Sequence, residues 1–495
     1  MKTRRWQDLL WPAGLFALGL LTRLPFRSRF LYHWDSVNFA LGLERYDVLL
    51  HQPHPPGYFL YTMLGRLVNL AVGDANASLV WISVIASGLA AMCLFYLGQT
   101  VWDRRCGIVA ALLLLTSPLF WFHGEVALSY MVEVPLVTTI ALLCYRHWTG
   151  ADGRVWLSAV LLGLAGGFRP DALVLLLPLW LAATWRFRWR KTILAVGLLV
   201  LTCLAWLVPM VALTGGAARY WAAFSAAGQT VAEESSFFGL RQILTNGVRL
   251  AAFTTYALGL GLLPLAAGAV LWARGHLTQY RSWLRKPRLR WLLWWTVPGL
   301  LFFLFVHIRQ PGHSFVIMPA LLLTLSFVLA EWLPRVTLQW PRPRRWAYAL
   351  IGLLLLVNVV FFLTAPPFLF GARHVVTTTP SWPTIHQRDI SLETRIAYIR
   401  AHFPPTGTVL LSFGVDFRHP DYYLREYQTI HYDQSPVTLP DNTERVVLFG
   451  NGLTGGAGAQ NVTLADGEPL YCLNLSPGQE VVVQGTIVSS RLLAP

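Results

Sequence analysis

Long apolar runs separated by short polar segments dominate the chain up to residue 365. A helix of roughly 17–25 apolar residues can cross the ~30 Å hydrocarbon core of a bilayer, and it satisfies every backbone polar group within its own segment. The runs lie at residues 9–24, 79–101, 108–122, 134–148, 156–168, 172–185, 193–213, 250–272, 291–306, 315–332 and 347–363. The pattern predicts a polytopic α-helical membrane protein with about 11 transmembrane helices.

Two further segments, residues 36–50 and 57–72, have helical spacing of apolar residues but are too polar to count as spans. The first is interrupted by charged residues beginning at Glu44. A mixed face of this kind suits an interfacial helix that lies along the headgroups. Counting the second as a span would place the basic segment 103–105 outside the cytoplasm. We therefore expect two interfacial helices in a first extracytoplasmic loop, residues 27–78.

The last part of the chain, residues 366–495, has a different pattern. Polar residues and turn formers are frequent, and short runs at 408–411, 445–449 and 480–488 are typical of strands. We expect a membrane domain at 1–365, followed by a small C-terminal α/β or β-rich extracytoplasmic domain.

Composition and charge agree with this division. Of 495 residues, 55% are hydrophobic and only 13% are charged. The net charge of +15 could suggest nucleic-acid binding, but Arg and Lys gather in short segments between the apolar runs, which is typical of cytoplasmic loops. We expect a cytoplasmic N-terminus on a retained signal anchor, no nucleic-acid partner, and a multi-pass protein of the bacterial plasma (inner) membrane. The five cysteines form no disulfide framework or metal-binding spacing.

Asp35, beside Trp34 in the first outer loop, is the sharpest chemical signal. A carboxylate at the membrane face can act as general base toward an acceptor hydroxyl or amine. The alternative is that Asp35 only caps the helix that starts near Ser36. Glu133 stands at the mouth of the fourth span, where an acid is costly unless it is paired or functional. It could place the acceptor, or merely complement the helix dipole.

Further candidates for substrate binding lie at the outer ends of the predicted spans. Imidazole groups can contact a phosphate or a metal, and guanidinium groups suit the phosphate of a lipid-linked donor. The alternatives are turn formation by the Pro-Pro-Gly segment at 55–57 and snorkelling of arginines to headgroups. The candidates are His51, His54, Tyr58, Glu125, Arg169, His307, Arg309 and His313. A divalent metal ion held by Asp35 and His54 is kept as a hypothesis, although no ligand spacing supports it.

Several of these motifs, in order, resemble a known family. They are Trp34-Asp35, the turn His54-Pro-Pro-Gly57, the sequence Asp103-Arg-Arg-x-Gly107 and the run at residues 112–136. Together they are similar to the C-type integral-membrane glycosyltransferases (GT-C fold), in the branch of the protein O-mannosyltransferases and the lipid A aminoarabinose transferase. The similarity covers roughly residues 10–190, and the tail is not part of it.

The resemblance implies a polyprenyl-phosphate-linked sugar as donor and inverting transfer to a cell-envelope lipid, glycan or protein outside the cytoplasm. It implies that Asp35 is the catalytic acid of the first loop and Glu133 the second outer acid. His54 stands where the aminoarabinose transferases have a Lys, and this departure from the family pattern bears on the phosphate contact at that place and on that particular substrate.

Two other functions are weighed against this one. A transporter or flippase predicts ionisable residues near mid-span and matching broken helices, whereas the acids here stand at span ends. A non-catalytic scaffold that binds partners through its tail leaves the first loop without a purpose. The sequence specifies neither the sugar nor the acceptor.

Overall fold

The computed structural model describes residues 3–151, 153–234, 239–276, 286–336, 342–365, 379–432, 437–450, 453–476 and 479–492. It divides into two compact units. The membrane unit comprises Met1–Arg27 and Tyr46–Thr384, and the C-terminal unit comprises Ser28–Arg45 and Ile385–Pro495.

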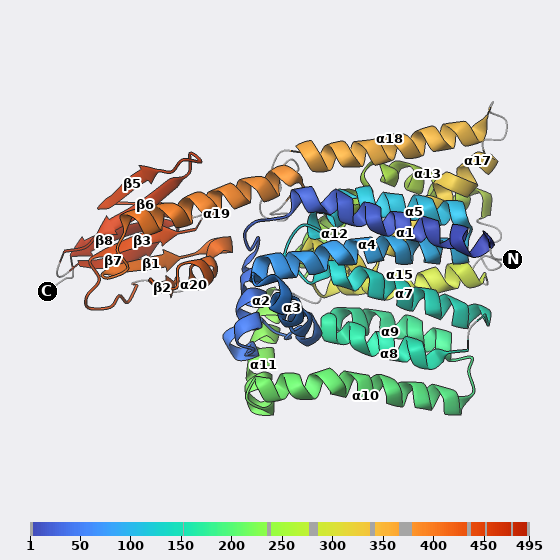
Figure 1. Ribbon diagram of the computed structural model, residues 1–495, viewed down its shortest axis with the longest axis horizontal. Coiled ribbons are helices and arrows are strands. Elements are labelled where there is room, and N and C mark those ends of the chain that lie inside the picture. Colours follow the sequence, from blue (N-terminus) through green and yellow to red (C-terminus); the bar gives the residue numbers. More distant parts are fainter. Residues whose placement is uncertain are drawn as a thin grey trace. The chain divides into compact units, whose positions relative to one another are not determined.

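The membrane unit is built from helices (Figure 1). They are α1 (Thr3–Arg23), α3 (Phe59–Val72), α4 (Ala75–Val101), α5 (Arg104–Thr116), α6 (Pro118–His123), α7 (Tyr130–Thr149), α8 (Val155–Phe168), α9 (Pro170–Thr184), α10 (Trp189–Leu213), α11 (Ala217–Glu234), α12 (Leu240–Leu258), α13 (Leu262–His276), α15 (Pro287–Phe305), α16 (Met318–Phe327), α17 (Leu333–Val336) and α18 (Pro343–Thr364). Short helical turns connect some of them: η1 (Leu24–Phe26), η2 (Val48–Leu50), η3 (Gly259–Gly261), η4 (Pro311–Val316) and the π-helical η5 (Val328–Trp332).

Helix α4 is the centre of this unit and packs against α1, α5 and α7 (Figure 1). Close packing with α1 depends on small residues, because a Cβ on Gly19 would lie 2.6 Å from the Cα of Gly88. Helices in a membrane associate through such close approach, since the lipid tails supply no hydrophobic driving force between them.

Every predicted span falls on helical residues of the structure. Six helices in the described residues are long and apolar enough to cross a membrane. The protein is therefore a multi-pass membrane protein, and the count of about 11 spans stays a prediction. The segment between the predicted runs at 193–213 and 250–272 contains α11 and the start of α12.

The two helices predicted in the first outer loop are present, but they belong to different units. Helix α3 matches the second predicted segment, while the first is shorter than expected and forms α2 (Trp34–Glu44). Helix α2 lies in the C-terminal unit and α3 in the membrane unit. Their interfacial placement stays a prediction.

The C-terminal unit is an α/β structure (Figure 1). Helix α19 (Trp382–His402) leads into it, and α20 (His419–Tyr423) and the short η6 (Gly414–Asp416) follow the first strand. A five-stranded sheet has the order β2-β1-β3-β6-β5, and a three-stranded sheet has the order β4-β8-β7. The strands are β1 (Thr408–Ser412), β2 (Gln428–His431), β3 (Arg445–Phe449), β4 (Thr454–Gly455), β5 (Ala459–Thr463), β6 (Pro469–Asn474), β7 (Gln479–Gln484) and β8 (Ile487–Leu492).

Alternation along the central strands explains the layers. Leu410 of β1 packs in one cluster with Ile396 of α19, and the neighbouring Val409 packs in a second cluster with Val481 of β7. Successive side chains of a strand point to opposite faces, so helix and second sheet cover opposite faces of the larger sheet. The predicted strands at 408–411 and 445–449 match β1 and β3, and the predicted run at 480–488 is a hairpin of β7 and β8.

The domain boundary predicted between residues 365 and 366 adjoins a stretch outside the described residues. The contacts divide the chain elsewhere. Ser28–Arg45, which the sequence pattern assigns to the membrane domain, packs with the C-terminal residues.

Candidate active site

Asp35 lies in the first turn of α2 in the C-terminal unit and is only 8% exposed. The residue that caps this helix is His33, whose Nδ1 accepts a hydrogen bond of 3.1 Å from the Asp35 backbone N–H. The Ser36 hydroxyl accepts from the His33 backbone N–H in return, which completes a capping box.

The geometry rules out the alternative that the Asp35 carboxylate caps the helix, because His33 is the N-cap residue. The Asp35 Oδ2 lies 3.4 Å from His33 Nδ1. Because that nitrogen accepts from a backbone N–H, it has no proton to donate to the carboxylate. The negative charge in the first turn still complements the helix dipole.

A buried group of two acids and one arginine forms in the membrane unit. Arg169 Nε lies 2.9 Å from Glu133 Oε2, and Arg169 Nη2 donates to Asp171 Oδ2 at 2.6 Å. Arg169 Nη1 donates to the Ser129 hydroxyl at 3.0 Å. We refer to Glu133, Arg169 and Asp171 as the acid–arginine cluster.

Helix ends position these side chains. Arg169 joins α8 to α9 with an extended backbone (φ −149°), Pro170 is the first residue of α9, and Asp171 stands in its first turn. Proline is favoured at that position and an acid in the first turn meets the positive end of the helix dipole. Glu133 has the same relation to the start of α7.

Burial makes the charges of the acid–arginine cluster costly in free energy. Glu133 is 1% and Arg169 is 2% exposed, whereas the Asp171 side chain is 24% exposed. Among the described residues, no group hydrogen-bonds to Glu133 Oε1. Two carboxylates against one guanidinium leave one formal negative charge, and a buried charge is retained only where it is paired or used. Glu133 therefore offers an acceptor oxygen to a hydroxyl or amine.

Aromatic rings enclose the guanidinium of Arg169. Its Cζ lies 4.2 Å from the ring centre of Tyr130 and 5.5 Å from that of Tyr58. Tyr130 in turn fits against Gly312, where a Cβ would come within 2.1 Å of the ring. The rings attract the cation through their π faces and restrict its orientation.

Two of the predicted histidines lie beside these tyrosines, and a third lies beside one of the two. The ring of His54 lies 4.9 Å from that of Tyr58. The His313 ring lies 5.6 Å from that of Tyr130, and His307 lies 5.6 Å from His313. The structure thus groups Tyr58, Glu133, Arg169 and these histidines, although they come from distant parts of the chain.

The other predicted residues have different surroundings. Glu125 is fully buried and accepts from Trp121 Nε1 at 3.0 Å, and the guanidinium of Arg23 covers the same Trp121 ring at 5.0 Å. His51 ends the turn η2 in the left-handed region (φ 57°). Arg309 is exposed between α15 and η4.

Sequence reasoning missed Asp171 and Tyr130. Asp171 was visible as the acid of Arg-Pro-Asp between two apolar runs, but nothing local shows that it shares Arg169 with Glu133. Tyr130 stands nearly one helical turn before Glu133 and resembles the aromatic residues that gather at membrane interfaces.

No metal cluster supports the hypothesis of a divalent ion. Within the ranges that the structure describes, no three His, Cys, Asp or Glu side chains gather as metal ligands. Asp35 and His54 lie in different units. The metal stays a prediction.

The fold as a whole belongs to the GT-C class. The structure is similar to the solved structure of ArnT from Cupriavidus metallidurans bound to undecaprenyl phosphate, with a TM-score of 0.52 and 13% identity over 95% of this chain and 98% of that chain. The apo form of the same protein gives a TM-score of 0.52 at 14% identity. The predicted fold class, a GT-C-like helical membrane protein with a strand-containing C-terminal domain, is confirmed.

Sequence similarity to known proteins covers part of the chain. Residues 53–212 match the family of dolichyl-phosphate-mannose-protein mannosyltransferases. A protein O-mannosyl-transferase of Dictyostelium discoideum is 36% identical over 90 residues, which is 16% of this chain and 11% of that protein. The undecaprenyl phosphate-alpha-4-amino-4-deoxy-L-arabinose arabinosyl transferase of Pectobacterium carotovorum is 30% identical over 133 residues, 25% of this chain and 23% of that protein. The match thus spans less than a quarter of either relative. The predicted resemblance is confirmed.

Proposed function

We propose that the protein is a membrane glycosyltransferase that moves a sugar from a polyprenyl-phosphate-linked donor to an acceptor outside the cytoplasm, with inversion. The observation that carries the proposal is the buried acid–arginine cluster, which lies inside the segment similar to the mannosyltransferase family. The likeness to an undecaprenyl-phosphate-bound structure and the similarity to an arabinosyl transferase support a lipid-linked donor.

The proposed reaction is a single displacement. An acceptor oxygen or nitrogen attacks the anomeric carbon, the bond from that carbon to the phosphate oxygen breaks, and polyprenyl phosphate leaves with the electron pair. Asp35 takes the proton of the acceptor as general base. The leaving phosphate carries its charge well, so cations that stabilise it should contribute more than protonation of the leaving group.

We assign the remaining roles from the geometry. Glu133, with its unused Oε1, orients the acceptor. Arg169 was predicted to bind phosphate, but all three of its nitrogens face Glu133, Asp171 or Ser129, which favours an organising role. Contact with the donor phosphate then falls to Arg309, His307 and His313, which are exposed or half-buried.

The proposal places the N-terminus in the cytoplasm and the C-terminal domain outside, in a bacterial plasma membrane, because the basic segments between the apolar runs follow the positive-inside pattern. The flippase alternative is not favoured. The two acids that pair with Arg169 stand in the first turns of α7 and α9 rather than near mid-span, and the matching segment is that of transferases.

The test is a donor-consumption assay on the reconstituted full-length protein with a panel of polyprenyl-phosphate sugars. One donor should be consumed, and Asp35→Asn should lower its turnover at least ~10²-fold, within the range expected of a general base. Asp441→Asn, an exposed acid in the C-terminal unit, is the matched control and should keep the normal rate. Full turnover in Asp35→Asn, or no donor consumed by the folded protein, would contradict the proposal.

A further inference from the structure

We propose that the C-terminal unit is the device that positions Asp35. The inference rests on the proposed role of Asp35, and it assigns Asp389, Arg388 and His419 as positioning residues. These side chains hold the segment Ser28–Tyr32, which leads directly into the cap of α2.

The first contact is a set of hydrogen bonds between the carboxylate of Asp389 in α19 and the segment Ser28–Tyr32. This residue is 1% exposed. Its Oδ2 accepts from the Arg29 N–H at 2.9 Å, and its Oδ1 accepts from the Phe30 N–H at 3.1 Å. The Ser28 hydroxyl lies 3.1 Å from the same Oδ1. Burial raises the pKa of Asp389, and the hydrogen bonds from Ser28, Arg29 and Phe30 act in the opposite direction by stabilising its charged form.

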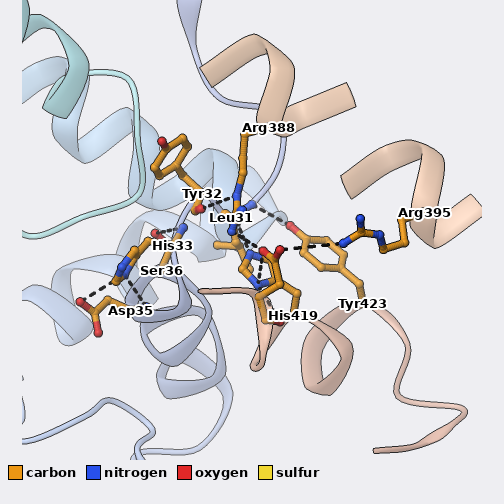
Figure 2. A network of polar contacts seen from close by, with 10 residues as sticks. Leu31, Tyr32, His33, Asp35, Ser36, Arg388, Arg395, His419 and Tyr423 are labelled. Atoms are coloured by element: carbon orange, nitrogen blue, oxygen red, sulfur yellow. Dashed lines mark hydrogen bonds and ion pairs between the residues drawn. The ribbon is translucent and has the colours of Figure 1, made fainter. Parts of the chain in front are cut away.

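The next residues are held through their backbone as well (Figure 2). The Leu31 N–H donates to the Tyr423 hydroxyl at 2.8 Å, and the Leu31 carbonyl lies 2.7 Å from His419 Nε2. Arg388 Nε donates to the Tyr32 carbonyl at 3.1 Å. His33 then caps α2 and contacts Asp35. A nearly continuous series of hydrogen bonds therefore joins the C-terminal unit to the helix start that carries Asp35.

A buried charged group keeps these side chains in place. Asp416 is 1% exposed, pairs with Arg388, and lies 3.9 Å from Arg395. The backbone carbonyl of Asp416 lies 3.2 Å from His419 Nδ1, and His419 is fully buried. Burying ions costs free energy. Here the buried Asp416 orients Arg388 and His419, whose donors face the backbone of the segment Ser28–Tyr32.

The body of α2 is held too. Arg418 donates to Asn38 Oδ1 at 3.0 Å, and Arg425 donates to both Glu44 oxygens at 2.8 and 2.7 Å. Helices α2 and α20 pack against each other. Both ends of α2 are therefore fixed to the C-terminal unit, so Asp35 and this unit form one structural body.

The consequence for catalysis follows from geometry. A misplacement of ~1 Å at a reacting group costs about 10²-fold in rate. Loosening the 28–32 segment should therefore reduce kcat while the donor site, which uses other residues, keeps its KM.

The experiment compares four variants of the full-length protein. Asp389→Asn keeps the shape but replaces an acceptor oxygen by a donor amide. His419→Phe removes the donor to Leu31, and His419→Gln restores a donor near the same place. Glu426→Gln is the control, because Glu426 pairs with the exposed Arg400 at the surface of this unit. Donor consumption and hydrogen exchange of peptides covering residues 28–45 are measured on each.

For Asp389→Asn we expect kcat to fall about 10- to 100-fold with KM for the donor within about 2-fold, and exchange at residues 29–31 to rise at least ~10-fold. His419→Phe should show the same changes as Asp389→Asn, and His419→Gln should recover most of the kcat. Glu426→Gln should have the kcat and the hydrogen exchange of the wild type. If Asp389→Asn unfolds the whole unit, seen as faster exchange in β1 and β3, the two His419 variants decide.

Two results would overturn the inference. One is wild-type exchange and kcat in both Asp389→Asn and His419→Phe. The other is an equal loss of kcat in His419→Gln and His419→Phe while β1 and β3 stay protected from hydrogen exchange. If instead Asp35→Asn keeps full turnover, the proposed role of Asp35 fails, and the exchange measurements still decide whether the C-terminal unit holds α2.

Discussion

The two units of the protein both bury charged networks, and they use them differently. In the membrane unit, Arg169 pairs with side-chain acids, and Glu133 keeps one oxygen without a hydrogen-bond partner among the described residues. In the C-terminal unit, Arg388, Asp389 and His419 each form a hydrogen bond with the backbone of the segment Ser28–Tyr32. The arrangement in the membrane unit leaves a Glu133 oxygen available to accept a hydrogen bond. The arrangement in the C-terminal unit fixes the position of the segment Ser28–Tyr32.

The largest expected effect is removal of the cation shared by two acids. Arg169→Met leaves the buried Glu133 and the half-buried Asp171 without this cation, so we expect a loss of about 3–5 kcal/mol in unfolding free energy together with loss of donor turnover. Thermal unfolding in detergent measures this. Arg335→Met, which removes a 67% exposed side chain of an ion pair, is the control. An Arg169→Met protein as stable as this control would show that the acids are not held as ions by Arg169.

The second effect is a pH dependence of stability that we expect in the C-terminal unit. Burial lowers the pKa of His419 from 6.5 to about 4, and Asp416 and Arg388 face it. The unfolded chain then binds more protons between these values, so the C-terminal unit should lose stability as pH falls from about 6.5 to 4, by at most about 3 kcal/mol. Hydrogen exchange in β1 and β3 reports the loss. His419→Gln should flatten the slope, and an unchanged slope would exclude His419 as its source. Asp389, whose pKa is raised, acts in the opposite direction at the acid end.

A third and smaller effect concerns the tyrosine that covers Arg169. Gly312→Ala places a Cβ within 2.1 Å of the Tyr130 ring, and relief of such a clash costs about 1–3 kcal/mol. Donor turnover should fall about 10-fold as the ring and the guanidinium shift. Gly352→Ala, on α18 with open space around it, should have no such effect. Normal turnover in Gly312→Ala would mean that the position of Tyr130 does not matter.

The smallest effect is expected at the exposed end of α2. Glu44 and Arg425 are 53% and 46% exposed, so breaking this pair with Glu44→Arg should cost only about 0.2–1 kcal/mol. Exchange of a peptide spanning residues 38–45 measures it. The double variant Glu44→Arg with Arg425→Glu should restore protection. A loss as large as that of Asp389→Asn would shift the main attachment of α2 to this end.

Local patterns were sufficient for much of the fold. The apolar runs predicted the helices of the membrane unit, and α3, β1 and β3 were found close to their predicted positions, because periodicity and apolar length act over a few turns or one strand. The same local signals selected Asp35 and Glu133 as acids that are unusual beside apolar segments. Helix α2 was overestimated in length, because its apolar spacing continues past Glu44 although the helix ends there.

The sequence by itself determined the fold class of the protein and its multi-pass character, and it selected acids such as Asp35 and Glu133 as candidate site residues. Only the tertiary structure decided that Arg169 serves both Glu133 and Asp171, and that Ser28–Arg45 belongs with residues 385–495. The physical reason is that both depend on side chains far apart in the chain. A hydrogen bond such as Phe30 to Asp389 joins residues 359 positions apart, and no periodicity or motif within a short window records which distant donor will meet which acceptor.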